Sequence, residues 1–344
     1  MPDHTIALRE RLKYLGLAVL TVFNTYVCVS LLALALASLS DHQLVLATVP
    51  LLCGTAIVTA LTVAFLPLAS WRRVGLGPGA GRAVPLGLVM GFVCSGALVL
   101  VALPLGWARW VPIEAEALRF DLRATPGLGL ALLAVGATGE ELFARGLLLQ
   151  CLARALGPAG AVVLTSAGFA ALHGANPGIT PLATCNTALF GAIFGVAVIR
   201  QGSLWLATGL HLGWNIALGV LGVNMSGITI RLSELNLRLG QPEWATGGDY
   251  GFEGGLLATG MALALLAIIW RLPAPGASES MLWNAPRRDR GVPATGLGGI
   301  DRAAGGESGG TVGDREDGEV DARTAGSVDS RPERRIRHGQ APDP

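Results

Sequence analysis

The sequence predicts an all-α fold, a polytopic membrane helix bundle of about eight transmembrane helices with a disordered C-terminal tail. Of its 344 residues, 51% are hydrophobic and only 14% are charged, whereas about a quarter of the residues in a soluble domain are usually charged. Long uncharged blocks separate the charges, as is typical of a membrane protein. The 48 glycines favour close contacts between membrane helices.

The predicted helices correspond to apolar blocks without charged residues in their centres. These blocks lie at roughly 14–38, 44–70, 84–107, 126–148, 159–174, 180–199, 203–223 and 254–270. Most reach the ~20 residues that a helix needs to cross ~30 Å of hydrocarbon, although the fifth is short and the eighth marginal. Each should be helical, because the bilayer offers no water to satisfy the backbone.

The blocks divide the chain into four parts. Residues 1–124 hold helices 1 to 3, residues 125–223 hold a core of helices 4 to 7, and residues 224–273 hold an outer loop and helix 8. Residues 274–344 are rich in Gly, Pro, Ser, Asp and Arg. Such a segment cannot bury enough apolar surface to offset its chain entropy, which predicts disorder.

Basic residues mark alternate loops and predict the orientation. They lie before helix 1, between helices 2 and 3, 4 and 5, and 6 and 7, and after helix 8: Arg9, Arg11, Lys13, Arg72, Arg73, Arg82, Arg154, Arg200 and Arg271. The loops at 39–43 and 175–179 have no Lys or Arg, and acids match or outnumber the arginines of 108–125 and 224–253. The positive-inside rule then places both termini in the cytoplasm, in a cytoplasmic membrane of the bacterial type.

Some other classes of protein are disfavoured. A net charge of +1 gives no support for nucleic-acid binding, and five cysteines without a C-x-x-C pair favour neither a disulfide framework nor a thiolate metal site. Residues 9–13 and the Ala35–Ala37 stretch resemble parts of a signal peptide. However, the apolar run exceeds the usual 7–15 residues, so an uncleaved first helix is favoured.

Helix 4 carries charges where a membrane helix normally avoids them. A charged side chain there costs ~2.5–3.5 kcal/mol on insertion scales. Glu141 and Arg145 are four residues apart and can pair on one helix face, whereas Glu140 lies ~100° around the helix and remains available for other chemistry. The alternative is a helix end solvated at the cytoplasmic interface.

Helix 5 contains His173, with Phe169 one turn earlier on the same face. Packing alone is the simpler explanation for a lone histidine. However, Glu140 lies 17 residues before Gly157 and His173 lies 16 after it. In an antiparallel hairpin turning at Gly157-Pro158, the two side chains would meet at the same depth.

Helix 7 contains His211 and Asn215, which lie one turn apart on one face. An interhelical hydrogen-bonding pair that stabilises the bundle is the alternative explanation. Since three helices each present such groups, a shared site is the favoured interpretation.

These groups suit hydrolysis of a peptide bond. Glu140 could take a proton from water that His173 helps to hold, and His211 with Asn215 could donate to the oxyanion. Glu141 and Arg145 would fix the helix. A zinc ion held by Glu140, His173 and His211 is also possible, but H-E-x-x-H and G-x-G-D motifs are absent. No cofactor is favoured.

The chain resembles the CPBP family, which groups type 2 CAAX prenyl endopeptidases with bacteriocin-processing and self-immunity proteins. The matching elements are Glu140-Glu141-x-x-x-Arg145, Phe169-x-x-x-His173, the stretch from Phe190-Gly191 to Gly202-Ser203-Leu204-Trp205, and His211-x-x-x-Asn215. The resemblance covers about 125–220. It implies a membrane endopeptidase with Glu140 as the base, His173 beside it, and His211 with Asn215 at the oxyanion.

The expected partners are therefore a membrane-associated protein or peptide substrate and the lipid bilayer. Two other classes stay open. An intramembrane glutamate with two histidines suits a transporter or proton relay, although no internal repeat is seen. A non-catalytic membrane scaffold is the second.

Overall fold

The computed structural model describes residues 8–40, 42–67, 69–113, 126–274 and 281–282. The chain divides into two units, residues 1–288 and 289–344, and the second lies outside the described residues. The predicted disorder of 274–344 thus falls almost entirely outside the described part.

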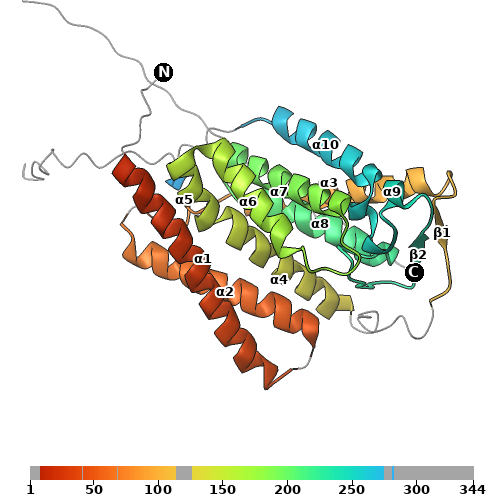
Figure 1. Ribbon diagram of the computed structural model, residues 1–344, viewed down its shortest axis with the longest axis horizontal. Helices are drawn as coiled ribbons and strands as arrows, with labels where there is room; N and C mark the ends of the chain where they lie inside the picture. The colour runs from red at the N-terminus through yellow and green to blue at the C-terminus, as the bar shows by residue number, and fades with distance from the viewer. Residues whose placement is uncertain (1–7, 41, 68, 114–125, 275–280, 283–344) are drawn as a thin grey trace, which may run out of the picture. The chain divides into compact units, whose positions relative to one another are not determined.

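Nine helices of ten or more residues make up the described fold (Figure 1). They are α1 (Leu8–Ala37), α2 (Gln43–Phe65), α3 (Ala80–Ala102), α4 (Pro126–Arg145), α5 (Leu147–Leu156), α6 (Pro158–Leu172), α7 (Pro181–Gln201), α8 (Trp205–Leu221) and α10 (Leu256–Arg271). Each predicted apolar block coincides with one helix, and α5 is additional.

Five helical segments are long and apolar enough to cross a membrane, namely α1, α2, α3, the α4–α5 segment and α7. The apolar helices α6, α8 and α10 are shorter, at 15, 17 and 16 residues. The chain is therefore an integral, mostly helical membrane protein, whereas the count of eight crossings stays a prediction.

Helix α5 exists because the chain breaks at Gly146. The Gly146 N–H still donates to the Leu142 oxygen (3.1 Å), but its ψ of −123° is not helical. The predicted turn at Gly157-Pro158 ends α5, since Gly157 has a φ of 86° and Pro158 opens α6. Arg154, expected in a loop, lies in the last turn of α5, 3.4 Å from Glu10 Oε1.

Glycines allow α3 and α8 to touch backbone to backbone. A Cβ atom added at Gly91 would overlap the backbone oxygen of Leu210, and one at Gly213 would overlap that of Leu88. Close approach of this kind is how membrane helices gain packing energy. It fixes the rotation of α8, which carries His211 and Asn215.

A small region outside the long helices pairs the segment after α3 with the segment after α8. Strands β1 (Ala108–Trp110) and β2 (Leu237–Leu239) pair antiparallel, and α9 (Glu243–Thr246), η2 (Gly248–Tyr250) and η3 (Phe252–Gly254) follow. Figure 1 shows β1, β2 and α9 at one end of the bundle and α5 at the other. The short strands were not anticipated from the sequence.

Two residues of the predicted polar tail pack against the helices. Met281 and Leu282 are fully buried, and the Leu282 N–H donates to the Arg73 oxygen (3.0 Å). The packed part of the chain thus includes residues beyond the predicted boundary at 274.

Candidate active site

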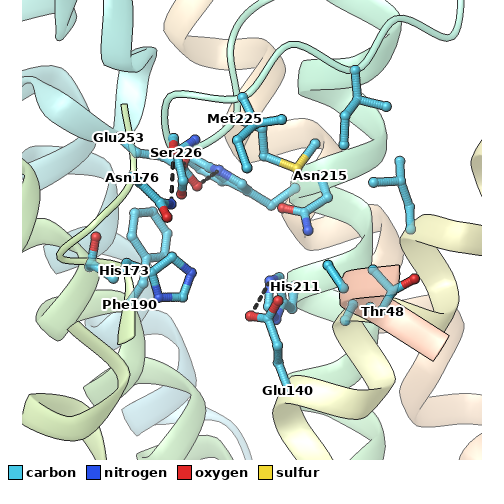
Figure 2. Close-up of a pocket in the computed structure, with 18 of the residues that line it drawn as sticks. Thr48, Glu140, His173, Asn176, Phe190, His211, Asn215, Met225, Ser226 and Glu253 are labelled. Carbon is cyan, nitrogen blue, oxygen red and sulfur yellow. Dashed lines mark hydrogen bonds and ion pairs between the residues drawn. The ribbon is translucent and has the colours of Figure 1, made fainter. Parts of the chain in front are cut away.

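A cavity of about 180 Å³ lies among α2, α4, α6, α7, α8 and the loops after α6 and α8. Glu140, His173, His211 and Asn215 all line it (Figure 2). Four side chains singled out in the sequence therefore face one space, although α4, α6 and α8 supply them from distant parts of the chain.

The adjacent carboxylates of α4 differ sharply in their surroundings. The Glu140 side chain is 31% exposed and faces the cavity, whereas the Glu141 side chain is completely buried. Among the described residues, the Glu140 Oε2 atom has no hydrogen-bond partner. Of the two acids, Glu140 is thus the one open to a ligand or a water molecule.

Two basic side chains donate hydrogen bonds to Glu141. Its Oε1 atom accepts from Arg145 Nη1 (3.3 Å) and from His211 Nδ1 (3.0 Å). Arg145 is itself completely buried and donates from Nη2 to the Gly191 oxygen (3.0 Å). A buried charge needs such pairing, so these contacts fix α4 against α7 and α8.

Aromatic rings enclose the Arg145 guanidinium. Its central carbon lies 4.5 Å from the centre of the Phe169 ring and 5.4 Å from that of Phe194. Phe194 also stacks on His211, with ring centres 5.0 Å apart and an interplanar angle of 13°. The cation and the imidazole thus share one aromatic wall, which limits their side-chain freedom.

His211 lies between the two carboxylates. Because a carboxylate only accepts, the hydrogen on Nδ1 points to Glu141, and Nε2 lies 3.9 Å from Glu140 Oε2. Glu141 therefore sets the tautomer of the ring. When the ring is protonated, Nε2 can donate into the cavity beside Glu140.

His173 lies across the cavity from Glu140 and His211, as Figure 2 shows. It is the C-cap of α6 and thus lies one residue beyond the end of that helix. The sequence predicts that the helix includes it. Its Nδ1 lies 2.8 Å from the Phe169 oxygen, which can only accept, so Nδ1 carries the hydrogen. The Nε2 of a neutral His173 is then an acceptor.

The Asn215 amide lies one helical turn from His211 and faces the same space (Figure 2). The side chains of His211 and Asn215 are both buried. An amide nitrogen and an imidazole nitrogen thus face the cavity from neighbouring turns of α8, as two donors to one oxygen atom would need.

Sequence reasoning missed Glu253, a buried carboxylate of η3 that also lines the cavity. Its Oε1 accepts from Trp214 Nε1 (3.0 Å), and its Oε2 accepts from the Ser226 N–H (2.5 Å) and hydroxyl (2.7 Å). The Ser226 oxygen accepts from Asn176 Nδ2 (2.9 Å). The only available signal was an acid directly before the last apolar block.

Tyr250 lies in the same loop segment, where burial raises the pKa of its phenol. The Tyr250 oxygen of the backbone accepts from the Gly227 N–H (2.8 Å). These contacts attach residues 225–228 to η2 and η3 and close one side of the cavity.

The zinc alternative rests on the sequence alone. Within the part of the chain that the structure describes, no group of three or more His, Cys, Asp or Glu side chains is placed to hold a metal ion. Whether Glu140, His173 and His211 together bind zinc stays a prediction.

An acid, two imidazoles and an amide thus meet in one cavity of a membrane helix bundle. Residues 123–217 match the family model described as type II CAAX prenyl endopeptidase Rce1-like. This match covers less than a third of the chain and shows that this segment is similar to type II CAAX prenyl endopeptidases. All six predicted site residues fall inside it. No curated protein and no solved structure matches the chain.

Proposed function

We propose that this protein is an intramembrane endopeptidase that hydrolyses a peptide bond of a membrane-associated protein or peptide with a water molecule activated by Glu140. The observation that carries the proposal is the contrast on α4. Glu141 is completely buried and bound to Arg145 and His211, while the Glu140 side chain is 31% exposed and lines the cavity.

In the proposed first step, Glu140 takes a proton from water, and the resulting hydroxide attacks the carbonyl carbon of the substrate. His173 Nε2 accepts the second hydrogen of the water and orients it, since its Nδ1 is bound to Phe169.

In the proposed second step, the oxyanion receives hydrogen bonds from the Asn215 amide and from Nε2 of protonated His211. The His211 ring lies between the carboxylates of Glu140 and Glu141. When the tetrahedral intermediate collapses, the C–N bond breaks and Glu140 returns its proton to the leaving amine. Preorganised donors of this type are often the largest single contribution to catalysis.

Glu141 and Arg145 act as positioning residues in this proposal, because neither lines the cavity. The family match to peptidases favours this function over a transporter, a proton relay or a non-catalytic scaffold. For location, we propose a cytoplasmic membrane of the bacterial type with both termini in the cytoplasm.

The test compares membrane proteomes by N-terminal peptide mapping in cells that produce the native chain, the Glu140→Gln variant or the Glu243→Gln variant. Glu243 is exposed and remote from the cavity, so its substitution is the matched control. We expect new N-termini with the native chain and the control, and none with Glu140→Gln. Equal cleavage by Glu140→Gln would contradict the assignment.

We also propose that the reaction needs no metal. Incubating the purified protein with a chelator should leave cleavage unchanged. Inactivation that added zinc reverses would overturn this part of the proposal and leave the peptidase assignment intact.

A further inference from the structure

The cavity extends from the middle of the helix bundle towards one end. On α4 it is lined from Leu132 to Glu140 and on α8 from His211 to Asn215, around the middle of each helix, whereas Phe169 and His173 line it from the end of α6. The α2 residues that line it, Leu44, Ala47 and Thr48, lie in the first turns of that helix. The start of α2 and the end of α6 lie towards the end of the bundle where α1 stops.

The loops of the same end complete the wall. Met225, Ser226, Ile228 and Ile230 line the cavity from the segment after α8, and Asn176 lines it from the segment after α6. Among the described lining residues there are two carboxylates, Glu140 and Glu253, and no Lys or Arg. The cavity therefore suits an uncharged segment of polypeptide and disfavours an acidic one.

Basic residues gather at the opposite end. That end holds the start of α1, the link between α2 and α3, and the ends of α5, α7 and α10. Its basic residues in the described part are Arg9, Arg11, Lys13, Arg72, Arg73, Arg82, Arg154, Arg200 and Arg271, and Glu10 is the one acid there.

Arg200 illustrates how this end is built. It donates from Nε to the Ile269 oxygen (3.2 Å) and from Nη2 to the Leu272 oxygen (2.9 Å), and it lies 5.1 Å from the centre of the Trp270 ring. It therefore binds the last carbonyls of α10 beside an aromatic residue, in the arrangement expected at a membrane interface.

We propose that the cavity opens to the extracytoplasmic side of the membrane, and that the substrates are protein segments exposed on that side after export. Short loops rich in Lys and Arg stay in the cytoplasm, so the opposite end, with the cavity, faces outward. The statement about substrates rests on the proposed peptidase function, whereas the direction of the cavity does not.

The experiment uses a membrane-impermeant maleimide on intact bacterial cells that produce the full chain with one added cysteine. Ala175→Cys places a thiol on the exposed loop after α6, and Gly81→Cys places one at the start of α3, where a Cβ meets open space. The native chain, with its five cysteines, gives the background.

We expect Ala175→Cys to be labelled in intact cells, and Gly81→Cys to be labelled only after the membrane is permeabilised. The reverse pattern would overturn the proposal. Labelling of both thiols in intact cells would also overturn it, because a fixed orientation would then be absent.

A second arm tests access to the cavity itself. The Ile228→Cys protein is compared with and without the same reagent applied from outside, and N-terminal mapping measures its Glu140-dependent cleavage. We expect loss of cleavage after labelling, because Ile228 lines the cavity. Labelling of Ile228→Cys only after the membrane is permeabilised would refute external access. If no Glu140-dependent cleavage exists at all, the peptidase function fails, while the labelling arm still decides the direction.

Discussion

Two regions build the cavity, and they differ in how much their own sequence reveals. The helical core, residues 126–221, supplies Glu140, His173, His211 and Asn215, while the loop segment, residues 222–255, supplies Ser226 and Glu253. Polar groups in the core stand out because an apolar helix tolerates them only at a cost. In the loop segment polar residues are ordinary. A polar residue is thus informative in proportion to how apolar its sequence surroundings are.

The comparison predicts that catalytic power lies in the core. Replacing Glu140 with Gln should lower kcat by about 10²- to 10⁴-fold, the usual contribution of a general base. The melting temperature in detergent should stay near that of the native protein, because Glu140 Oε2 makes no hydrogen bond to a described residue.

The matched substitution is Glu141→Gln on the same helix. It should lower the melting temperature as well as the activity, because Glu141 accepts from both Arg145 and His211. Equal melting temperatures for the two variants would contradict the division of roles between these neighbouring acids.

Within the helical core, the sequence likewise predicts some side-chain contacts and not others. The i,i+4 spacing of Glu141 and Arg145 predicts their ion pair, and the structure contains it at 3.3 Å. The spacing says nothing of the bond from His211 Nδ1 to Glu141, because that contact depends on how α8 is rotated against α4. Nor could it reveal that Gly146 separates α5 from α4, since a glycine alone does not decide whether a helix continues.

The tertiary contacts of the loop segment are harder to predict from the sequence than those of the helical core. Glu253 reaches Trp214 across 39 residues and Ser226 across 27 residues. No periodicity links a loop to a helix face, so only the folded chain brings these groups together.

The next largest effect is expected at the buried cation of the core. Replacing Arg145 with Met leaves Glu141 buried without that partner, and breaking a buried ion pair in this way costs about 3–5 kcal/mol. Thermal unfolding in detergent should show a large loss of stability. The double variant Arg145→Met/Glu141→Gln should recover part of it, because it also removes the buried negative charge. Additive losses in the double variant would mean that the two residues do not act as a pair.

A moderate effect is expected where α3 supports α8. Replacing Gly91 with Ala should destabilise the bundle by about 1–3 kcal/mol, the usual cost of overpacking, because the new methyl group meets the Leu210 oxygen. Gly96→Ala on the same helix is the control, since its Cβ meets nothing within 4 Å. Thermal unfolding of the two variants measures the difference, and equal stability would mean that the contact between these helices is loose enough to yield.

The smallest effect is expected in the loop segment and separates its role from that of the core. In Glu253→Gln, the amide can accept from Trp214 or from Ser226, but its NH₂ group must then face the other donor. A buried donor left without an acceptor costs about 1–3 kcal/mol, which loosens residues 225–228 over the cavity. Since α3 holds α8 independently, His211 and Asn215 should keep their positions. KM should therefore rise more than kcat falls. Ser226→Ala, which removes the hydroxyl but keeps the N–H bond to Glu253, should change KM less. A fall in kcat at constant KM would instead place Glu253 with the groups that stabilise the transition state, and the division between the two regions would disappear.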